Sequence, residues 1–490
     1  MKFIRARNFM VVVFLICGSF SGEIRARSVT EVSGRNPVAL RSQINEPIFQ
    51  VKYSEPLAVL NFLKNLSSDA PTNNPFKQVF SKSKYNQEKY QKLIAEFEKV
   101  NVDYEYDFPD YPLGEQIGLS TASLLKKNLI DSRTIDEFRN SSIGIVPNES
   151  LFRFASILQT FTPVYRELVY EPNKETFERQ LSELKNMIAA TNMISLFDAS
   201  IKFYNSAWDN SVPFNFVFYP LPNSRGFSSA TAFANNSEIP IPTGMTNYNL
   251  LLGLMCHEIF HIFFDNEPLV FQKEIREWEA SNPSKSAFYA FTLLNESLAT
   301  ALGNGGYAYF RLSGKLNEGS WYGRKYVSEM AKKIYPMVKD YVESQRTIDK
   351  EFLDNYVRIY DENFSSWNFE LDNIMLGRSV LTDNAADLQV IDRKFPYRPT
   401  AEFIEGISVA SIEKMAKAEV VRTRIICVSK DNKKKLELIK QGFPELKDWK
   451  PNSKTDFAYA VLLKDKAYLI IINSVKKTIK DQIETLKINP

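Results

Sequence analysis

The spacing of apolar and polar positions divides this chain into a helical N-terminal part, a strand-rich stretch and a second helical part. Between Ile48 and Tyr204, apolar residues recur at i, i+3 and i+4, which is typical of amphipathic helices. The helices predicted there are 56–66, 86–100, 115–129, 151–160 and 174–194.

The pattern changes after residue 211. Val212–Leu221 and Phe227–Pro242 are rich in β-forming residues and are separated by a Pro-Asn-Ser-Arg-Gly stretch. This composition predicts two or three strands with a tight connection.

The last part of the chain predicts a separate small unit. Ser320–Tyr397 reads as helical and aromatic-rich, and we expect a boundary near Arg398-Pro399-Thr400. Beyond it the pattern predicts a strand, a basic helix, a hairpin and a closing helix, at 422–429, 433–440, 457–473 and 478–486. We therefore expect an α+β protein, with a mainly helical domain that contains a small sheet, followed by a small C-terminal α/β domain.

Leu250–Asn266 is apolar almost all the way round, so as a helix it should run through the middle of a domain. It nevertheless carries His257, Glu258 and His261, and buried ionisable groups need partners. Residues four apart lie on one helical face, so both imidazoles can bind one ion while Glu258 reaches a water beside it. This is the H-E-x-x-H arrangement of two zinc ligands and a general base. The chain has only 2 His in 490 residues, and both belong to this motif, so chance is a poor explanation.

With no third histidine, the third protein ligand of a catalytic zinc must be a carboxylate or, less favourably, a thiolate. Cys256 points about 100° away from His257 on a helix and is expected to pack as a small apolar residue. Glu296, in the apolar segment Phe291–Leu302, is the preferred candidate, although a solvent-facing glutamate would fit the same pattern. Asp265 is its competitor, and we expect it to orient a histidine instead.

His257-Glu258-x-x-His261, with Asn295-Glu296-x-x-Ala299 downstream, resembles the gluzincin metallopeptidases, the group of thermolysin and aminopeptidase N. The resemblance covers about residues 212–309. It implies a zincin-like fold, one Zn²⁺ held by His257, His261 and Glu296, and peptide hydrolysis with Glu258 as general base. Two features depart from the pattern. The gap to Glu296 is longer than is usual in these families, and Thr300 stands where thermolysin-like enzymes carry Asp. The sequence thus indicates the clan without a named family.

Two further parts of a peptidase site follow from this resemblance. In the zincin plan an edge strand beside the zinc pairs with the substrate backbone, and Phe227–Phe233 is our candidate, although an ordinary supporting sheet fits equally well. Negative charge that develops on the scissile carbonyl oxygen needs a donor. No histidine remains for that role, so we expect a tyrosine or arginine from the segment after Glu296, with Tyr307 and Tyr322 as first candidates. Plain packing is the alternative for both.

Met1–Ser21 reads as a secretory signal, with Lys2, Arg5 and Arg7 before a short apolar core. A lipoprotein signal that ends at Cys17 is the less favoured version. Residues 22–45 should form a flexible lead. Removal of the signal takes the net charge from +3 to 0, which gives no reason to expect nucleic acid or an anionic membrane as a partner. The apolar core of the signal is too short to span a bilayer as a retained helix, so we expect no integral membrane segment in the mature chain. After export, Cys256 and Cys427 could form a disulfide or remain as two buried thiols.

The sequence therefore predicts an exported zinc metallopeptidase, periplasmic or extracellular, that acts on peptide or protein substrates. Its expected regions are 1–21, 22–45, a helical part 46–205, a zincin-like catalytic part 206–400 and an α/β part 401–490. Two other functions stay open. One is a catalytically inactive binding protein with a zincin fold, and the other is a metal-dependent hydrolase of a non-peptide amide or ester.

Overall fold

The computed structural model of the protein describes residues 49–68, 70–71, 73–104, 120–222, 230–396, 400–417 and 422–488. The predicted signal peptide, the flexible lead and Cys17 lie outside these residues, as do 115–119 of one predicted helix and 227–229 of the predicted edge strand.

Helices predominate before residue 205, as the periodicity predicts. The first begins where the Ser54 hydroxyl accepts the N–H of Leu57, with Pro56 in the first turn. In chain order the helices are α1 (Glu55–Leu66), α2 (Pro75–Ser81), α3 (Glu88–Phe97), α4 (Thr121–Asp131), α5 (Ile135–Ser141), α6 (Asn148–Tyr165), the π-helical η2 (Arg166–Tyr170), α7 (Glu171–Ala190) and α8 (Met193–Phe203).

A four-stranded sheet follows, with the strand order β1-β2-β4-β3. Its members are β1 (Phe49–Tyr53), β2 (Phe214–Leu221), β3 (Thr231–Phe233) and β4 (Asn236–Pro242). β1 and β4 pair with β2 in parallel, and β3 pairs with β4 antiparallel as an edge strand. The sequence pattern did not reveal β1, a five-residue strand from the predicted helical region that joins the sheet across the expected boundary at 205.

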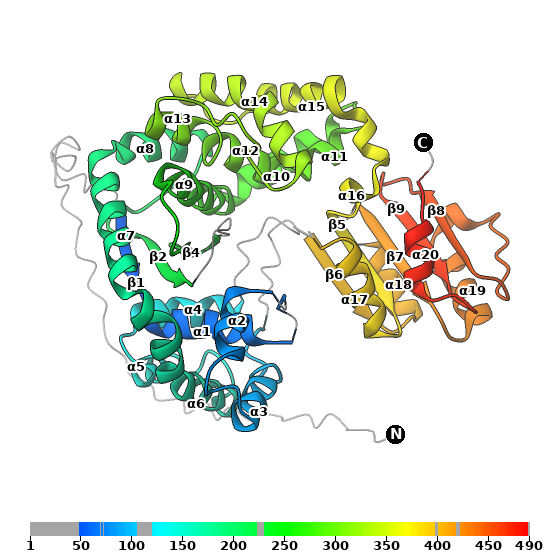
Figure 1. The fold of residues 1–490 in the computed structure, drawn as a ribbon. Coiled ribbons are helices and arrows are strands. Elements are labelled where there is room, and N and C mark those ends of the chain that lie inside the picture. The colour runs from blue at the N-terminus through cyan, green and yellow to red at the C-terminus, as the bar shows by residue number, and fades with distance from the viewer. Residues whose placement is uncertain are drawn as a thin grey trace, which may run out of the picture. The chain divides into compact units, whose positions relative to one another are not determined.

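Both faces of this sheet are buried, because alternate side chains enter two different apolar clusters. Phe216, Phe218 and Ile239 pack in the larger cluster, which includes the central helix α9 (Tyr248–Asp265). Val217 and Tyr219 pack in the second cluster with the N-terminal helices. Figure 1 shows α9 between this sheet and the helices α12 and α14.

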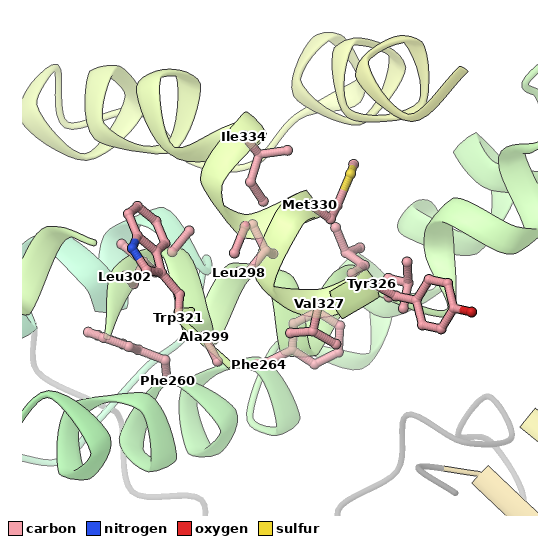
Figure 2. Packing of buried hydrophobic residues seen from close by; sticks show 14 of the residues in the cluster. Phe260, Phe264, Leu298, Ala299, Leu302, Trp321, Tyr326, Val327, Met330 and Ile334 are labelled. Carbon is pink, nitrogen blue, oxygen red and sulfur yellow. The ribbon is translucent and has the colours of Figure 1, made fainter. Parts of the chain in front are cut away.

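The larger cluster is completed by helices that follow α9. They are α10 (Leu269–Ser281), α11 (Ala287–Phe291), α12 (Leu294–Leu302), α13 (Tyr307–Ser313), α14 (Lys325–Glu343) and α15 (Lys350–Phe364). In Figure 2, Phe260 and Phe264 of α9 face Leu298 and Ala299 of α12, with residues of α14 beyond them. As predicted, α9 runs through the interior, and beyond its first turn its only polar side chains are the motif residues and Asp265.

The C-terminal part is a five-stranded sheet with the order β6-β5-β7-β9-β8. All its neighbouring strands pair in parallel except the β8–β9 hairpin. Its elements are η3 (Ser365–Phe369), α16 (Leu371–Ile374), β5 (Gly377–Thr382), α17 (Ala385–Lys394), β6 (Thr400–Glu405), α18 (Val409–Ala416), β7 (Thr423–Val428), α19 (Asn432–Gly442), η4 (Pro444–Leu446), β8 (Phe457–Leu462), β9 (Tyr468–Asn473) and α20 (Ile479–Thr485).

β5 corrects the prediction that Ser320–Tyr397 is helical. It lies between β6 and β7, so the sheet begins before the expected boundary at 398–400, and that boundary falls inside the sheet. A central parallel strand is buried on both faces and shows no alternation, which is why a six-residue run was read as part of a helical region.

The protein is thus a mixed α/β structure with two small mixed sheets. Residues Glu46–Pro490 form one compact unit. Among the described helices, none combines the length and the apolar character needed to cross a bilayer.

Candidate metal centre

The two histidines of α9 face one another across one helical turn. His257 Nε2 lies 3.0 Å from His261 Nε2, and the two rings are nearly perpendicular. Their side chains are 3% and 16% exposed, so one is fully buried and the other opens to solvent. The i, i+4 spacing therefore produces the predicted convergence of the imidazoles.

α12 brings the third group. Glu296 Oε2 lies 3.6 Å from Nε2 of both histidines, although 35 residues separate Glu296 from His261 in the sequence. Gly303, the residue that ends α12, makes this approach possible. A Cβ atom there would lie 2.7 Å from backbone atoms of His257, closer than real contacts allow.

The separations fit a single small cation. Zinc ligands bind at about 2.0–2.1 Å in a tetrahedron, so ligand atoms around one ion lie about 3.3 Å apart. The three separations here are 3.0, 3.6 and 3.6 Å. Two imidazoles and one carboxylate are also the donor set of a catalytic zinc that keeps one position open. This donor set suits other divalent metals as well.

Asn295 orients His261. Its side-chain Oδ1 lies 2.8 Å from His261 Nδ1, so the proton of the neutral imidazole is held on Nδ1 and the Nε2 lone pair faces the other ligand atoms. The sequence did not single out Asn295 for this role, and the expectation that Asp265 orients a histidine stays a prediction. The outer nitrogen of His257 has no hydrogen-bond partner among the described residues. Asp265 also lies near Tyr204, where its charge adds to the effect of burial and of Glu267 in raising the pKa of the tyrosine.

We expect Asn295→Ala to weaken zinc binding by about 10–100-fold, the usual cost of losing a group that orients a metal ligand. Zinc affinity, measured by competition with a chromogenic chelator, checks this prediction. Asp265→Asn is the control and should bind zinc as the wild type does. A loss of affinity in the Asp265 variant with normal affinity in the Asn295 variant would reverse the two roles.

Glu258 lies on the side of α9 next to the sheet. Its carboxylate accepts the backbone N–H of Ala232 in the edge strand β3. Burial raises the pKa of Glu258 to about 7, and the charge of Glu296 adds to this rise, whereas His261 and the Ala232 N–H act in the opposite direction. The residue is only 7% exposed. A buried carboxyl whose pKa is close to neutrality is suited to take up and release a proton.

The two tyrosine candidates lie in different surroundings. The ring of Tyr322 is stacked against that of His257, with 5.8 Å between the ring centroids. Tyr307 is buried in the larger apolar cluster, and the guanidinium of Arg311 lies 5.9 Å from its ring centroid. The structure therefore brings Tyr322 beside the predicted ligands and gives Tyr307 the surroundings of a packing residue.

Cys256 and Cys427 are free, buried thiols, and no disulfide joins them. Burial raises the pKa of Cys256 to about 12, which disfavours the thiolate form that would bind a metal. Within the described chain, His257, His261 and Glu296 are the one group of three or more His, Cys, Asp or Glu residues whose ligand atoms converge, all within 4.8 Å.

Comparison of the chain with protein-family models, with curated proteins and with solved structures gave no match. The assignment of this site therefore depends on its own residues and geometry.

Proposed function

We propose that this protein is a zinc-dependent metallopeptidase of the gluzincin type, with a zincin-like catalytic region. One observation carries the proposal, namely that His257 and His261 of α9 and Glu296 of α12 have three ligand atoms 3.0–3.6 Å apart, beside Glu258 of α9. A structural metal site is closed by four protein ligands and leaves no position for water, so a buried base beside it would have no water to deprotonate.

Each residue then has a defined role. His257, His261 and Glu296 hold the ion, and Asn295 keeps His261 in the tautomer that can bind it. A bound Zn²⁺ would supply Lewis acidity to the scissile carbonyl and to the attacking water. Glu258 accepts a proton from the attacking water and passes it to the leaving amine, which balances the hydrolysis. Tyr322 is our preferred donor to the oxygen of the scissile carbonyl, because it is the tyrosine that lies against His257.

The edge strand β3 supplies a surface for the substrate backbone. One side of β3 pairs with β4, and Ala232 at its middle contacts Glu258. A peptide added along the other side of β3 would form main-chain hydrogen bonds that tolerate many side chains. We propose peptide and protein substrates on this basis. An exported location, periplasmic or extracellular, is proposed from the N-terminal sequence.

Metal content and proteolysis of the purified protein test the proposal together. We expect one zinc per chain by inductively coupled plasma mass spectrometry, and cleavage of casein that 1,10-phenanthroline stops and added zinc restores. Zinc without cleavage of casein or of a peptide library, but with turnover of simple esters or amides, would favour the non-peptide hydrolase. Zinc without any turnover would favour an inactive binding protein. A chain that binds no metal would contradict the proposal.

A further inference from the structure

A groove extends from the residues that follow Tyr322 toward the C-terminal sheet. Its first part is a cavity of about 220 Å³ lined by residues that include Arg324, Lys325 and Lys394. A second cavity of about 470 Å³ shares Tyr326, Asp372, Lys394 and Phe395 with the first and continues to Leu486, Lys487 and Ile488. We name these two cavities together the distal groove.

The distal groove lies within reach of a peptide bound at the metal centre. Tyr322 is in ring contact with His257, and Arg324 is two residues further along the chain. Consecutive Cα atoms are about 3.8 Å apart, so the Cα of Arg324 lies within about 7.6 Å of that of Tyr322. An extended peptide advances about 3.3 Å per residue, so a substrate would reach the groove about three to five residues from its scissile bond.

The rim of the groove is cationic. Glu370 is already engaged, because it accepts the Tyr326 hydroxyl at 2.6 Å and pairs with Lys325 at 2.5 Å. Lys394 and Lys487 are exposed and form no ion pair with any described residue. The other carboxylate among the described lining residues is that of Asp372.

The floor of the groove is apolar and aromatic. Phe395 and Leu486 are buried beneath it, whereas Phe369 is 41% exposed where it lines the second cavity. In Figure 2 the ring of Tyr326 lies at the margin of the apolar cluster, with its hydroxyl turned away from that cluster. An apolar floor with a positive rim suits a peptide segment that combines acidic and apolar side chains.

We infer that the distal groove is a substrate-binding subsite selective for acidic residues, located about three to five residues from the scissile bond. This inference rests on the proposed peptidase function and adds the substrate class to it. Lys394, at the end of α17, and Lys487, after α20, are the residues that would recognise the substrate carboxylates. Each solvent-exposed ion pair should change affinity by about two- to fivefold.

Peptide binding tests this inference without dependence on turnover. The probes are fluorescein-labelled twelve-residue peptides with one neutral, leucine-rich core and a Glu-Leu-Glu or Lys-Leu-Lys tail at either end. Fluorescence anisotropy gives the Kd values of these peptides for two zinc-loaded proteins. The first carries Glu258→Gln alone, and the second, the groove variant, carries Glu258→Gln together with Lys394→Glu/Lys487→Glu. The matched control combines Glu258→Gln with Lys82→Glu/Lys333→Glu, which makes the same charge change at exposed lysines outside the groove.

We expect the acidic tail to bind about five- to tenfold more tightly than the basic tail at one end of the core. The groove variant should abolish or reverse this preference, and the control variant should keep it. Equal binding of acidic and basic tails, or a preference that the groove variant leaves unchanged, would overturn the inference. The proposed function is judged separately, from zinc content and casein cleavage by the wild type, so failure of one is distinguishable from failure of the other.

Discussion

Glu258→Gln is expected to lower kcat/KM for peptide hydrolysis by about 10²–10⁴-fold, the usual contribution of a positioned general base. Glutamine keeps the size of the side chain and can still accept the Ala232 N–H through its carbonyl oxygen, but it cannot take up the proton of the attacking water. Because Glu258 is not one of the converging ligands, zinc content should stay at one per chain. Steady-state kinetics and metal analysis of the same preparations check both expectations.

Glu274→Gln is the matched control for this variant, since it makes the same chemical change at an exposed position on α10. It should cleave peptides at the wild-type rate. If Glu258→Gln kept wild-type activity with a full complement of zinc, the general base would have to be another residue. If it lost zinc as well as activity, Glu258 would act in holding the ion.

Glu296→Ala should abolish zinc retention through purification, and with it peptide hydrolysis. Loss of an orienting partner alone costs about 10–100-fold in metal affinity, so loss of a direct ligand should cost more than about a hundredfold. The loss of zinc binding should also be visible in the thermal stability of the protein. Free zinc at 1,000 times its Kd stabilises a folded protein by about 4 kcal/mol, so added zinc should raise the Tm of the wild type but not that of the variant.

Asp265→Asn serves again as the control, because it removes a carboxylate from the same region without touching the three converging ligands. It should retain zinc and respond to zinc in thermal unfolding as the wild type does. Zinc retained in Glu296→Ala but lost in Asp265→Asn would make Asp265 the third ligand, which the sequence analysis considered as the competing carboxylate.

The local periodicity of the chain was enough to predict several of the helices and the C-terminal hairpin, whereas the shorter helices α2, α5 and α8 were not predicted. Apolar spacing over a dozen or more residues is recorded in the sequence itself, so α1, α6, α9 and α12 lie within a few residues of their predicted positions. The strands were harder to predict from the sequence than the helices. β1 and β5 are short and pair in parallel with strands far away in the chain. Neither has a hairpin turn beside it or an alternation of apolar and polar residues, so the sequence pattern did not indicate them as strands.

The candidate site also has one part that the sequence predicts and another that only the tertiary structure decides. The sequence alone determined His257, Glu258 and His261 as a unit, because an α-helix of itself brings residues four apart onto one face. It also indicated Glu296, since a lone carboxylate in an apolar helix needs a partner. Only the tertiary structure decided which groups surround that unit. The contact of Gly303 with His257 sets how closely α12 approaches α9, and it thereby brings Asn295 to His261.

The same reason explains why Tyr322 lies beside His257 while Tyr307 packs in the apolar cluster, and why the end of α17 meets the segment after Tyr322 to form the distal groove. These contacts depend on the angles and distances at which separate elements pack. Such angles are set by many side chains at once, and no local stretch of sequence records them.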